Sequence, residues 1–464
     1  MLSLLPIFSL AQIAPIPIPV PPPNQAPSAT PEVVIVPYPI RALPGELDDV
    51  FVFNSNSPEV IETEGILLST LPSDGKAVPG AHLDFALSGR FDIFAHHIAR
   101  ANTPEGRPVY LGIVVYNPGK RPVTVNVQQV VSYLTHPDAP FVDLPSLVEN
   151  PDGKVYSGPG SRVMNDILRG VRQTGFPSQV VIPPGESKML LNVPIPISSA
   201  RSTLMRLRSN GKVHVASLAM FPQLDSFNKE DNPTTPSYRA PLLAEWQQLL
   251  KNGKLAEPRD RAPTPPDETD GHIIYGRVAG VAQGSQWQSE IVDRPGKKKL
   301  TIPEQGQAFS YALSTVTEVT LGTGQVQSAA LRVRYPDTAY RAHGNYGVHY
   351  SLSLPLHNAT RETQRVTVSL QTPLKREDRQ NQLYFLQNPA QEPIFFRGTV
   401  QVTYKNDRGQ ESKRYVHLVQ RRGQRGDPLV TLNLEPDEQR LVKIDFLYPP
   451  DATPPQVLTV TTLS

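Results

Sequence analysis

The sequence predicts an all-β protein, and three observations lead to this prediction. The chain of 464 residues contains 50 prolines and 30 glycines. Proline is about twice as frequent as the roughly 5% usual in proteins, and it interrupts helices while it is tolerated in turns. Many short segments alternate apolar and polar residues, which is typical of strands with one buried face. The third observation is a hairpin pattern that occurs twice.

The repeated hairpin consists of an apolar strand ending in Asn, a polar turn, and a second strand that contains Val-Thr-Val. The first copy has its Asn at Asn117 and the second at Asn358. A turn with the pattern Pro-x-Glu follows each copy, beginning at Pro184 and at Pro436. Because the two landmarks occur in the same order, we expect two related β-domains. Short strands recurring between turns favour tandem immunoglobulin-like β-sandwiches.

The chain divides into five predicted segments, according to shifts in composition. They are a signal peptide at 1–11, a Pro-rich arm at 12–45, a first β-sandwich domain at 46–222 with a helical insertion near 161–171, a linker at 223–270 with a helix at 241–252, and a second β-sandwich domain at 271–464. Both helices are predicted from apolar residues at helical spacing. Within the first domain, Asn210-Gly211 is the preferred dipeptide of a two-residue turn, so a hairpin is expected there.

The amino-terminal residues predict export. Leu2 to Leu10 form a short apolar stretch, and Ser9 and Ala11 are the small residues expected before a cleavage site. No Lys or Arg precedes Arg41, so only the amino terminus supplies positive charge there. The expected location is the periplasm, the outer surface or the extracellular medium. No later stretch approaches the roughly 20 apolar residues of a membrane helix, so no transmembrane span is expected.

Composition also excludes several function classes. The net charge is only +2, without the concentrated basic face that nucleic-acid binding requires. Cysteine is absent, which excludes disulfides, thiolate catalysis and iron–sulfur clusters. No calcium loop, nucleophile elbow or zinc-protease motif occurs, and no cofactor is expected. The adjacent His96 and His97 lie on a predicted strand and should point to opposite faces, so a metal site there is disfavoured.

The segment 338–350 is the candidate ligand-binding site. It combines aromatic rings with amide, guanidinium and imidazole groups around two glycines, a set that suits stacking on sugar faces and hydrogen bonding to hydroxyl groups. The alternative is a glycine turn that leads into a strand, with the tyrosines packed over the sheet. The candidate residues are Tyr340, Arg341, His343, Asn345 and Tyr346.

Several motifs together resemble a cyanobacterial family of exported proteins that is catalogued only as a domain of unknown function. The resemblance covers nearly the whole chain after the predicted signal. It implies an extracytoplasmic setting and assigns no catalytic residues. The motifs are GRFDIFAHHIA at 89–99, VENPDGKVYSGPGSRVMNDILRG at 148–170, LAEWQQLL at 243–250, RDRAPTPP at 259–266, IIYGRVAGVAQGSQW at 273–287, YPDTAYRAHGNYGV at 335–348 and FLYPPDATPPQVLTV at 446–460.

Three functional hypotheses follow. The first is a non-enzymatic structural or adhesive protein of the cell envelope or extracellular matrix. The second is a glycan-binding module of the cell surface that uses the residues of 338–350. The third is a carbohydrate-active hydrolase of unrecognised type, because carboxylates far apart in sequence can meet in a groove. An envelope glycan or an envelope protein is the expected partner, and the sequence does not indicate an oligomeric state.

Overall fold

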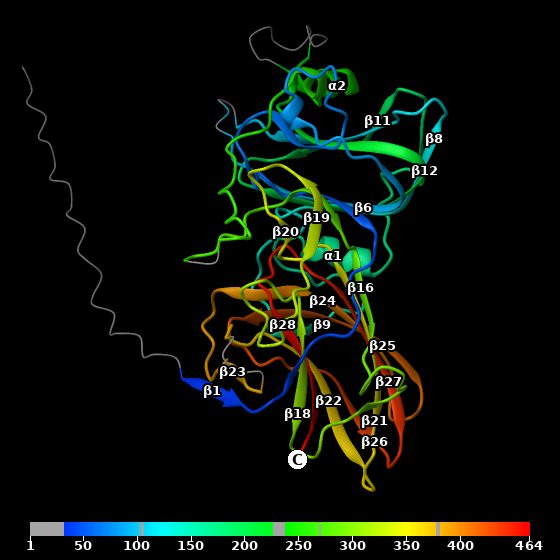
Figure 1. Ribbon diagram of the computed structural model, residues 1–464, viewed down its shortest axis with the longest axis vertical. Coiled ribbons are helices and arrows are strands. Elements are labelled where there is room, and N and C mark those ends of the chain that lie inside the picture. Colours follow the sequence, from blue (N-terminus) through cyan, green and yellow to red (C-terminus); the bar gives the residue numbers. More distant parts are fainter. Residues whose placement is uncertain (1–31, 102, 104–105, 226–236, 269–270, 377–380) are drawn as a thin grey trace, which may run out of the picture.

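The computed structural model describes residues 32–101, 103, 106–225, 237–268, 271–376 and 381–464 (Figure 1). The predicted signal and residues 12–31 of the predicted arm lie outside this part of the chain. Over the described residues the protein is mostly β, with several sheets and two α-helices. The prediction of a mainly β protein is therefore confirmed.

The first half of the chain builds two facing sheets, which form the upper part of Figure 1. A long strand, β12 (Ala200–Met220), belongs to both of them. Its first part continues a sheet with β3 (Phe51–Ser55), β4 (Val60–Ile61), β6 (Leu87–Ala99), β8 (Val123–Leu134) and β10 (Gln179–Ile182). Its second part pairs with β5 (Gly65–Ser69) and β7 (Val109–Tyr116), and β7 pairs with β11 (Ser187–Ile195).

The second half builds two further facing sheets in the lower part of Figure 1. One contains β2 (Ile40–Arg41), β18 (Ala308–Leu313), β28 (Gln456–Thr462), β22 (Gln364–Gln371) and β26 (Pro428–Leu434). The other contains β16 (Gln286–Glu290), β17 (Leu300–Thr301), β21 (His349–His357), β27 (Gln439–Leu447), β24 (Ile394–Lys405), β25 (Glu411–Arg421) and β9 (Leu147–Glu149). Two small ribbons complete the strands: β1 (Val33–Val36) with β23 (Leu383–Leu386), and β13 (Gln223–Leu224) with β14 (Tyr238–Arg239).

The two halves share a strand order and a register. The order β3-β6-β12-β8-β10 corresponds to β2-β18-β28-β22-β26, and within each of these two orders the first pair is parallel and the other pairs are antiparallel. In each half, the residue before the landmark Asn pairs with the residue after the Glu of the Pro-x-Glu turn. These pairs are Tyr116 with Ser187 and His357 with Gln439. The repeated sequence pattern therefore corresponds to a repeated arrangement of strands.

Each landmark Asn joins the two turns of its own half. The Asn117 amide nitrogen donates to three backbone carbonyls, those of Arg121, Ile182 and Pro183, at 2.8, 3.0 and 3.2 Å. The Asn358 amide nitrogen donates to the carbonyls of Glu362, Leu434 and Glu435, at 2.8, 2.9 and 3.1 Å. Both Asn side chains are fully buried. We call this arrangement the Asn clamp, and it connects the two landmarks physically.

The predicted hairpin at Asn210-Gly211 is wrong, because β12 continues through this dipeptide without reversing. Residues before it pair with β6 and β8, and residues after it pair with β5 and β7. A register irregularity between Ser209 and Val213 lets the strand pass from one sheet to the other. Gly211 is needed for close packing here, since a Cβ atom would lie 2.8 Å from a Val123 methyl group.

Strands cross between the halves in both directions. From the second half, β15 (Ala279–Gln283), β19 (Ala329–Arg334) and β20 (Arg341–Ala342) extend the first-half sheet beyond β3. From the first half, β1, β2 and β9 pair with second-half strands. The division of the chain at 223–270 stays a prediction, since the sheets mix strands from both sides of it.

Helices occur in both regions where the sequence predicts them. Helix α2 (Leu243–Asn252) covers the outer face of the first-half sheet that contains β5 and β7, where Trp246 is fully buried. Helix α1 (Ser161–Leu168) lies between the two pairs of sheets in Figure 1 and packs on β8 and β12 from one side and on β24 and β27 from the other. A short 3-10 helix spans Pro79–Ala81. The insertion that carries α1 therefore holds the two halves together.

Candidate functional site

The candidate segment forms a tight turn at the junction of the two halves. Strand β20 enters the turn, and β21 leaves it toward the second-half core. Gly344 is required because a Cβ atom there would lie 2.4 Å from the Tyr346 ring, which folds back over the glycine. The Tyr346 hydroxyl donates to the Ala452 carbonyl at 3.3 Å, which holds the ring against the loop after β27.

A cavity of about 220 Å³ opens beside this turn. Its wall combines residues that are distant in the sequence: the end of β3, the segment before β15, the turn itself and the loop before β28. His343, Asn345 and Tyr346, three of the residues proposed from the sequence, line it. We call it the junction cavity.

Two buried amide residues line the junction cavity, and their oxygen atoms lack hydrogen-bond partners in the described part of the chain. Asn54 and Asn56 lie on the same side of the β3 segment and are 4% and 3% exposed. Their Oδ1 atoms are buried and have no hydrogen-bond partner among the described residues. An unpaired buried polar group typically costs about 1–3 kcal/mol of stability, so these two oxygens would gain from a hydrogen-bond donor supplied by a bound molecule.

A pair of rings separates the junction cavity from a second one. The Tyr275 and His343 rings lie 4.2 Å apart between centroids at an angle of 34°, and both residues also line an adjoining cavity of about 300 Å³. Burial, and to a lesser degree the nearby Arg341 charge, lowers the pKa of His343 to about 4. His343 is therefore neutral at pH 7, and its Nδ1 atom has no partner in the described part of the chain.

The contacts of the other three residues proposed from the sequence, Asn345, Tyr340 and Arg341, differ from those of His343 and Tyr346. Asn345 is buried inside the turn, where its amide nitrogen donates to the Gln327 carbonyl at 3.0 Å and to the Tyr350 hydroxyl at 3.1 Å. Asn345 therefore lines the cavity as part of the structure of the turn. Tyr340 lies under the Arg334 guanidinium, 3.7 Å from the ring centroid, and lines the adjoining cavity together with Arg341. Ligand binding by these five residues stays a prediction.

Sequence reasoning missed the residues that complete the cavity: Asn54, Asn56, Tyr275, Arg277 and Lys375. One signal was present, since Asn-Ser-Asn places two amides on one face of a strand that begins with Phe-Val-Phe. The remaining three come from segments that only the tertiary fold brings to the turn.

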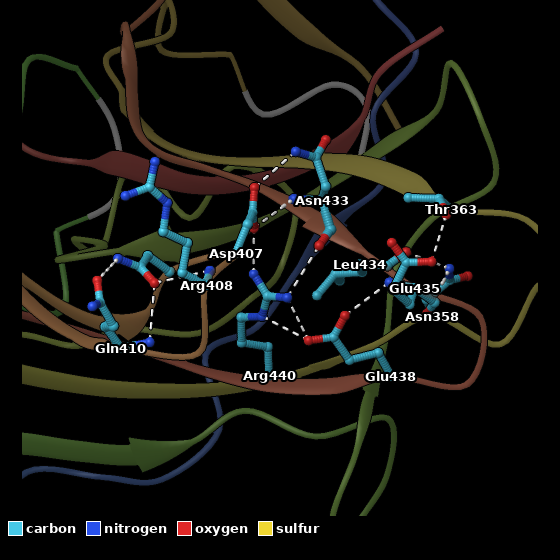
Figure 2. A network of polar contacts seen from close by, with 11 residues as sticks. Asn358, Thr363, Asp407, Arg408, Gln410, Asn433, Leu434, Glu435, Glu438 and Arg440 are labelled. Atoms are coloured by element: carbon cyan, nitrogen blue, oxygen red, sulfur yellow. Dashed lines mark hydrogen bonds and ion pairs between the residues drawn. The ribbon is translucent and has the colours of Figure 1, made fainter.

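A larger cleft of about 910 Å³ lies on the second half and contains a network of charges (Figure 2). Its centre is the buried Arg440, whose guanidinium lies between the carboxylates of Asp407 and Glu438. Asp407 also accepts hydrogen bonds from the Asn433 backbone and side chain, at 3.1 and 2.7 Å. Since the one guanidinium pairs with both carboxylates, the network fixes the β24–β25 turn against β26 and β27, and we assign it a structural role.

The adjacent histidines contact different groups, as their strand position predicts. His96 Nδ1 lies 2.8 Å from the Ser202 hydroxyl, whereas His97 contacts the Ser55 hydroxyl and the Pro58 carbonyl. Burial lowers the pKa of His96 to about 3 and that of His97 to about 4. In the described residues, no group of three or more His, Asp or Glu side chains could hold a metal ion. No helix in the described ranges has the length and apolar character needed to cross a membrane.

Comparison with protein families shows a match over residues 38–462 to the family described as protein of unknown function (DUF3370). The chain belongs to this family. A search of curated proteins gave no match. The cyanobacterial origin and the export implied by the resemblance stay predictions.

Comparison with solved structures gave only distant likenesses. Fet3p, a multicopper oxidase that functions in iron import, is 9% identical with a TM-score of 0.12, over 79% of this chain and 53% of that one. Lac15 from a marine microbial metagenome is 9% identical with a TM-score of 0.11, over 91% and 66%. Procruciferin, an 11S globulin from Brassica napus, is 10% identical with a TM-score of 0.09, over 87% and 85%. This chain thus spans about half the length of Fet3p, and TM-scores this low carry no argument about fold or function.

Proposed function

We propose that this member of the DUF3370 family is a non-enzymatic, exported protein of the cell envelope that binds a glycan in the junction cavity. The observation that carries the proposal is the pair of buried amide residues, Asn54 and Asn56, which line the cavity and whose oxygens have no partner among the described residues. Amide oxygens accept hydrogen bonds from hydroxyl groups, and a sugar offers several hydroxyls within a small volume. The Tyr346 ring supplies an apolar face on the same wall.

The size of the cavity limits what it can hold. Its volume of about 220 Å³ is below the roughly 300–1,000 Å³ of sites for drug-sized ligands. We therefore expect one terminal sugar unit to enter, with the rest of the glycan outside.

The alternatives explain the cavity less well. A purely structural or adhesive role gives no reason for two unsatisfied buried amides. A glycoside hydrolase uses a pair of carboxylates on either side of the bond that it cleaves, and no Asp or Glu is among the described residues lining the junction cavity.

We also propose that the two halves are related immunoglobulin-like sandwiches that arose by duplication. The shared strand order, the shared register and the two Asn clamps support this relationship. Equal dependence of the two halves on their clamp residues, tested below, would strengthen it.

The binding proposal is tested by screening the purified chain on a glycan array that includes envelope polysaccharide fragments, followed by calorimetry on the best ligand. We expect Asn54→Ala with Asn56→Ala to weaken binding at least tenfold, because two accepting groups are lost. The exposed Asn126→Ala is the matched control and should bind as the wild type does. Absence of binding to any glycan, or unchanged affinity in the double variant, would contradict the proposal.

A further inference from the structure

The charges around the junction cavity are unbalanced. Its described lining contains two cationic side chains, Arg277 and Lys375. The Arg277 guanidinium is already paired, because it lies 2.5 Å from a Glu59 carboxylate oxygen. Lys375 forms no ion pair with any described carboxylate, and its amino group lies 5.5 Å from the centre of the Phe395 ring. One positive charge at the cavity therefore lacks a counterion within the described chain.

The surroundings of Lys375 favour the arrival of an anion. Lys375 is exposed at the edge of the cavity. Desolvation, and secondarily the like charge of Arg422, lowers the pKa of Lys375 to about 8. A pKa lowered in this way means that the site disfavours an isolated ammonium, and an anion beside the amino group would relieve that penalty. His343, which also lines the wall, is neutral at pH 7 and adds no charge.

We infer, on the basis of the proposed glycan binding, that the junction cavity selects an acidic sugar whose carboxylate pairs with Lys375 while its hydroxyl groups donate to Asn54 and Asn56. A single unpaired cation matches a monoanion, which a sugar carboxylate is at neutral pH. A phosphate dianion would leave charge unbalanced. The amide oxygens cannot donate, so they are suited to hydroxyl groups and unsuited to the carboxylate itself. The cavity thus separates the two kinds of polar group that a uronic acid carries.

The inference is tested by calorimetry with two matched oligosaccharides that differ only in their terminal unit, glucose in one and glucuronic acid in the other. The wild type is expected to bind the acidic ligand at least tenfold more tightly than the neutral one. Lys375→Met keeps most of the length of the side chain and removes its charge, so it should abolish this preference. The exposed Lys297→Met is the control for net charge and should retain the preference.

The outcomes separate the inference from the proposed function. Equal affinity of the wild type for the two ligands, or an acidic preference that survives in Lys375→Met, would overturn the inference and leave glycan binding standing. Failure of the wild type to bind either ligand would count against both. Intrinsic fluorescence of each variant, compared with that of the wild type, shows whether a loss of binding reflects loss of the fold.

Discussion

The two halves of the molecule differ at the edges of two corresponding sheets, the one that contains β7 in the first half and the one that contains β21 in the second. Beside β7, the second part of β12 provides an antiparallel neighbour, whereas β16 and β17 pair with the equivalent strand β21 in parallel. Beyond β27 the second half adds β24, β25 and β9, while in the described chain β11 has only β7 as a partner. The hairpins and their clamps are therefore the common scaffold. The edges of these sheets differ because the two halves have different strands between their landmark residues.

The same contrast occurs beside the clamps. In the first half, Glu186 and Lys188 form an exposed ion pair 3.7 Å long. At the equivalent positions of the second half, Glu438 holds a buried Arg440 that also contacts Asp407. Asp407 belongs to the turn between β24 and β25, for which the first half has no counterpart. The second half thus has a buried network, which includes the extra hairpin, where the first half has a surface ion pair. The network is expected to stabilise the fold more than the exposed pair only while all its members are present.

The chain contains two tryptophans, and each reports on one half. Trp246 is buried against the first-half sheet, and Trp287 is buried in the second-half core. Variants with Trp246→Phe or Trp287→Phe therefore leave one fluorescent reporter each. Urea unfolding of the two single-tryptophan proteins measures the halves separately.

The largest single-site effect is expected from the clamps. Asn117→Ala and Asn358→Ala each remove the hydrogen bonds that a buried side-chain amide donates to three backbone carbonyls. We expect each to lower the free energy of unfolding by about 2–4 kcal/mol, seen first by Trp246 for Asn117→Ala and by Trp287 for Asn358→Ala. Asn126→Ala, an exposed control, should change it by less than about 0.5 kcal/mol. Tolerance of one clamp substitution together with loss of stability from the other would refute the equivalence of the halves.

Acidification should separate the halves next. In the first half, His82, His96 and His97 have pKa values held far below 6.5, so below pH 6.5 the unfolded chain takes up protons that the folded chain cannot, and stability falls with falling pH. Asp92, whose pKa burial raises to about 6, offsets one of them, since the folded state protonates first. In the second half, the lowered pKa values of His343 and His417 have the same destabilising effect, and the raised pKa of Asp451 offsets one of them.

Between pH 7 and pH 5 we therefore expect both halves to lose stability, and the first half to lose more than the second by on the order of 2 kcal/mol. Urea unfolding at the two pH values, followed through Trp246 and Trp287 in turn, measures the difference. The comparison between pH 7 and pH 8 serves as the control, because these histidines are neutral throughout that interval. An equal loss at both reporters would show that the buried histidines do not distinguish the halves.

The smallest effect concerns the Pro-x-Glu turns. Gly185 has φ +69° and Asp437 has φ +57° at the equivalent position, so the first half uses glycine for a left-handed conformation that the second half accepts with aspartate. No atom would contact a Cβ at position 185, so Gly185→Ala adds backbone strain alone, about 1 kcal/mol. Gly175→Ala is a suitable control, since that glycine has equal space and no positive φ. Urea unfolding read by Trp246 measures both, and a neutral Gly185→Ala would show that this turn relaxes.

The candidate site could be predicted only in part. The turn at 338–350 was recognisable from its glycines, tyrosines and histidine, and His343 and Tyr346 do line the junction cavity. Asn345 has the same chemistry as Asn54, yet it is consumed by hydrogen bonds inside the turn. Composition cannot distinguish these two amides, because the difference is whether neighbouring backbone groups are within hydrogen-bonding distance. Lys375 could not be predicted for a related reason, since its place at the cavity depends on segments such as Asn54 that are hundreds of residues away.

The sequence by itself determined the mainly β architecture, the two helices and the repeated Asn and Pro-x-Glu landmarks, because these depend on periodicity and turn chemistry within short windows. It could not determine that β12 continues through Asn210-Gly211, since the choice between a turn and a bent strand rests on partners in two different sheets. Nor could it show that α1 and the exchanged strands join the halves. Those contacts, and the cavity that they enclose, exist only because the tertiary structure places distant segments side by side.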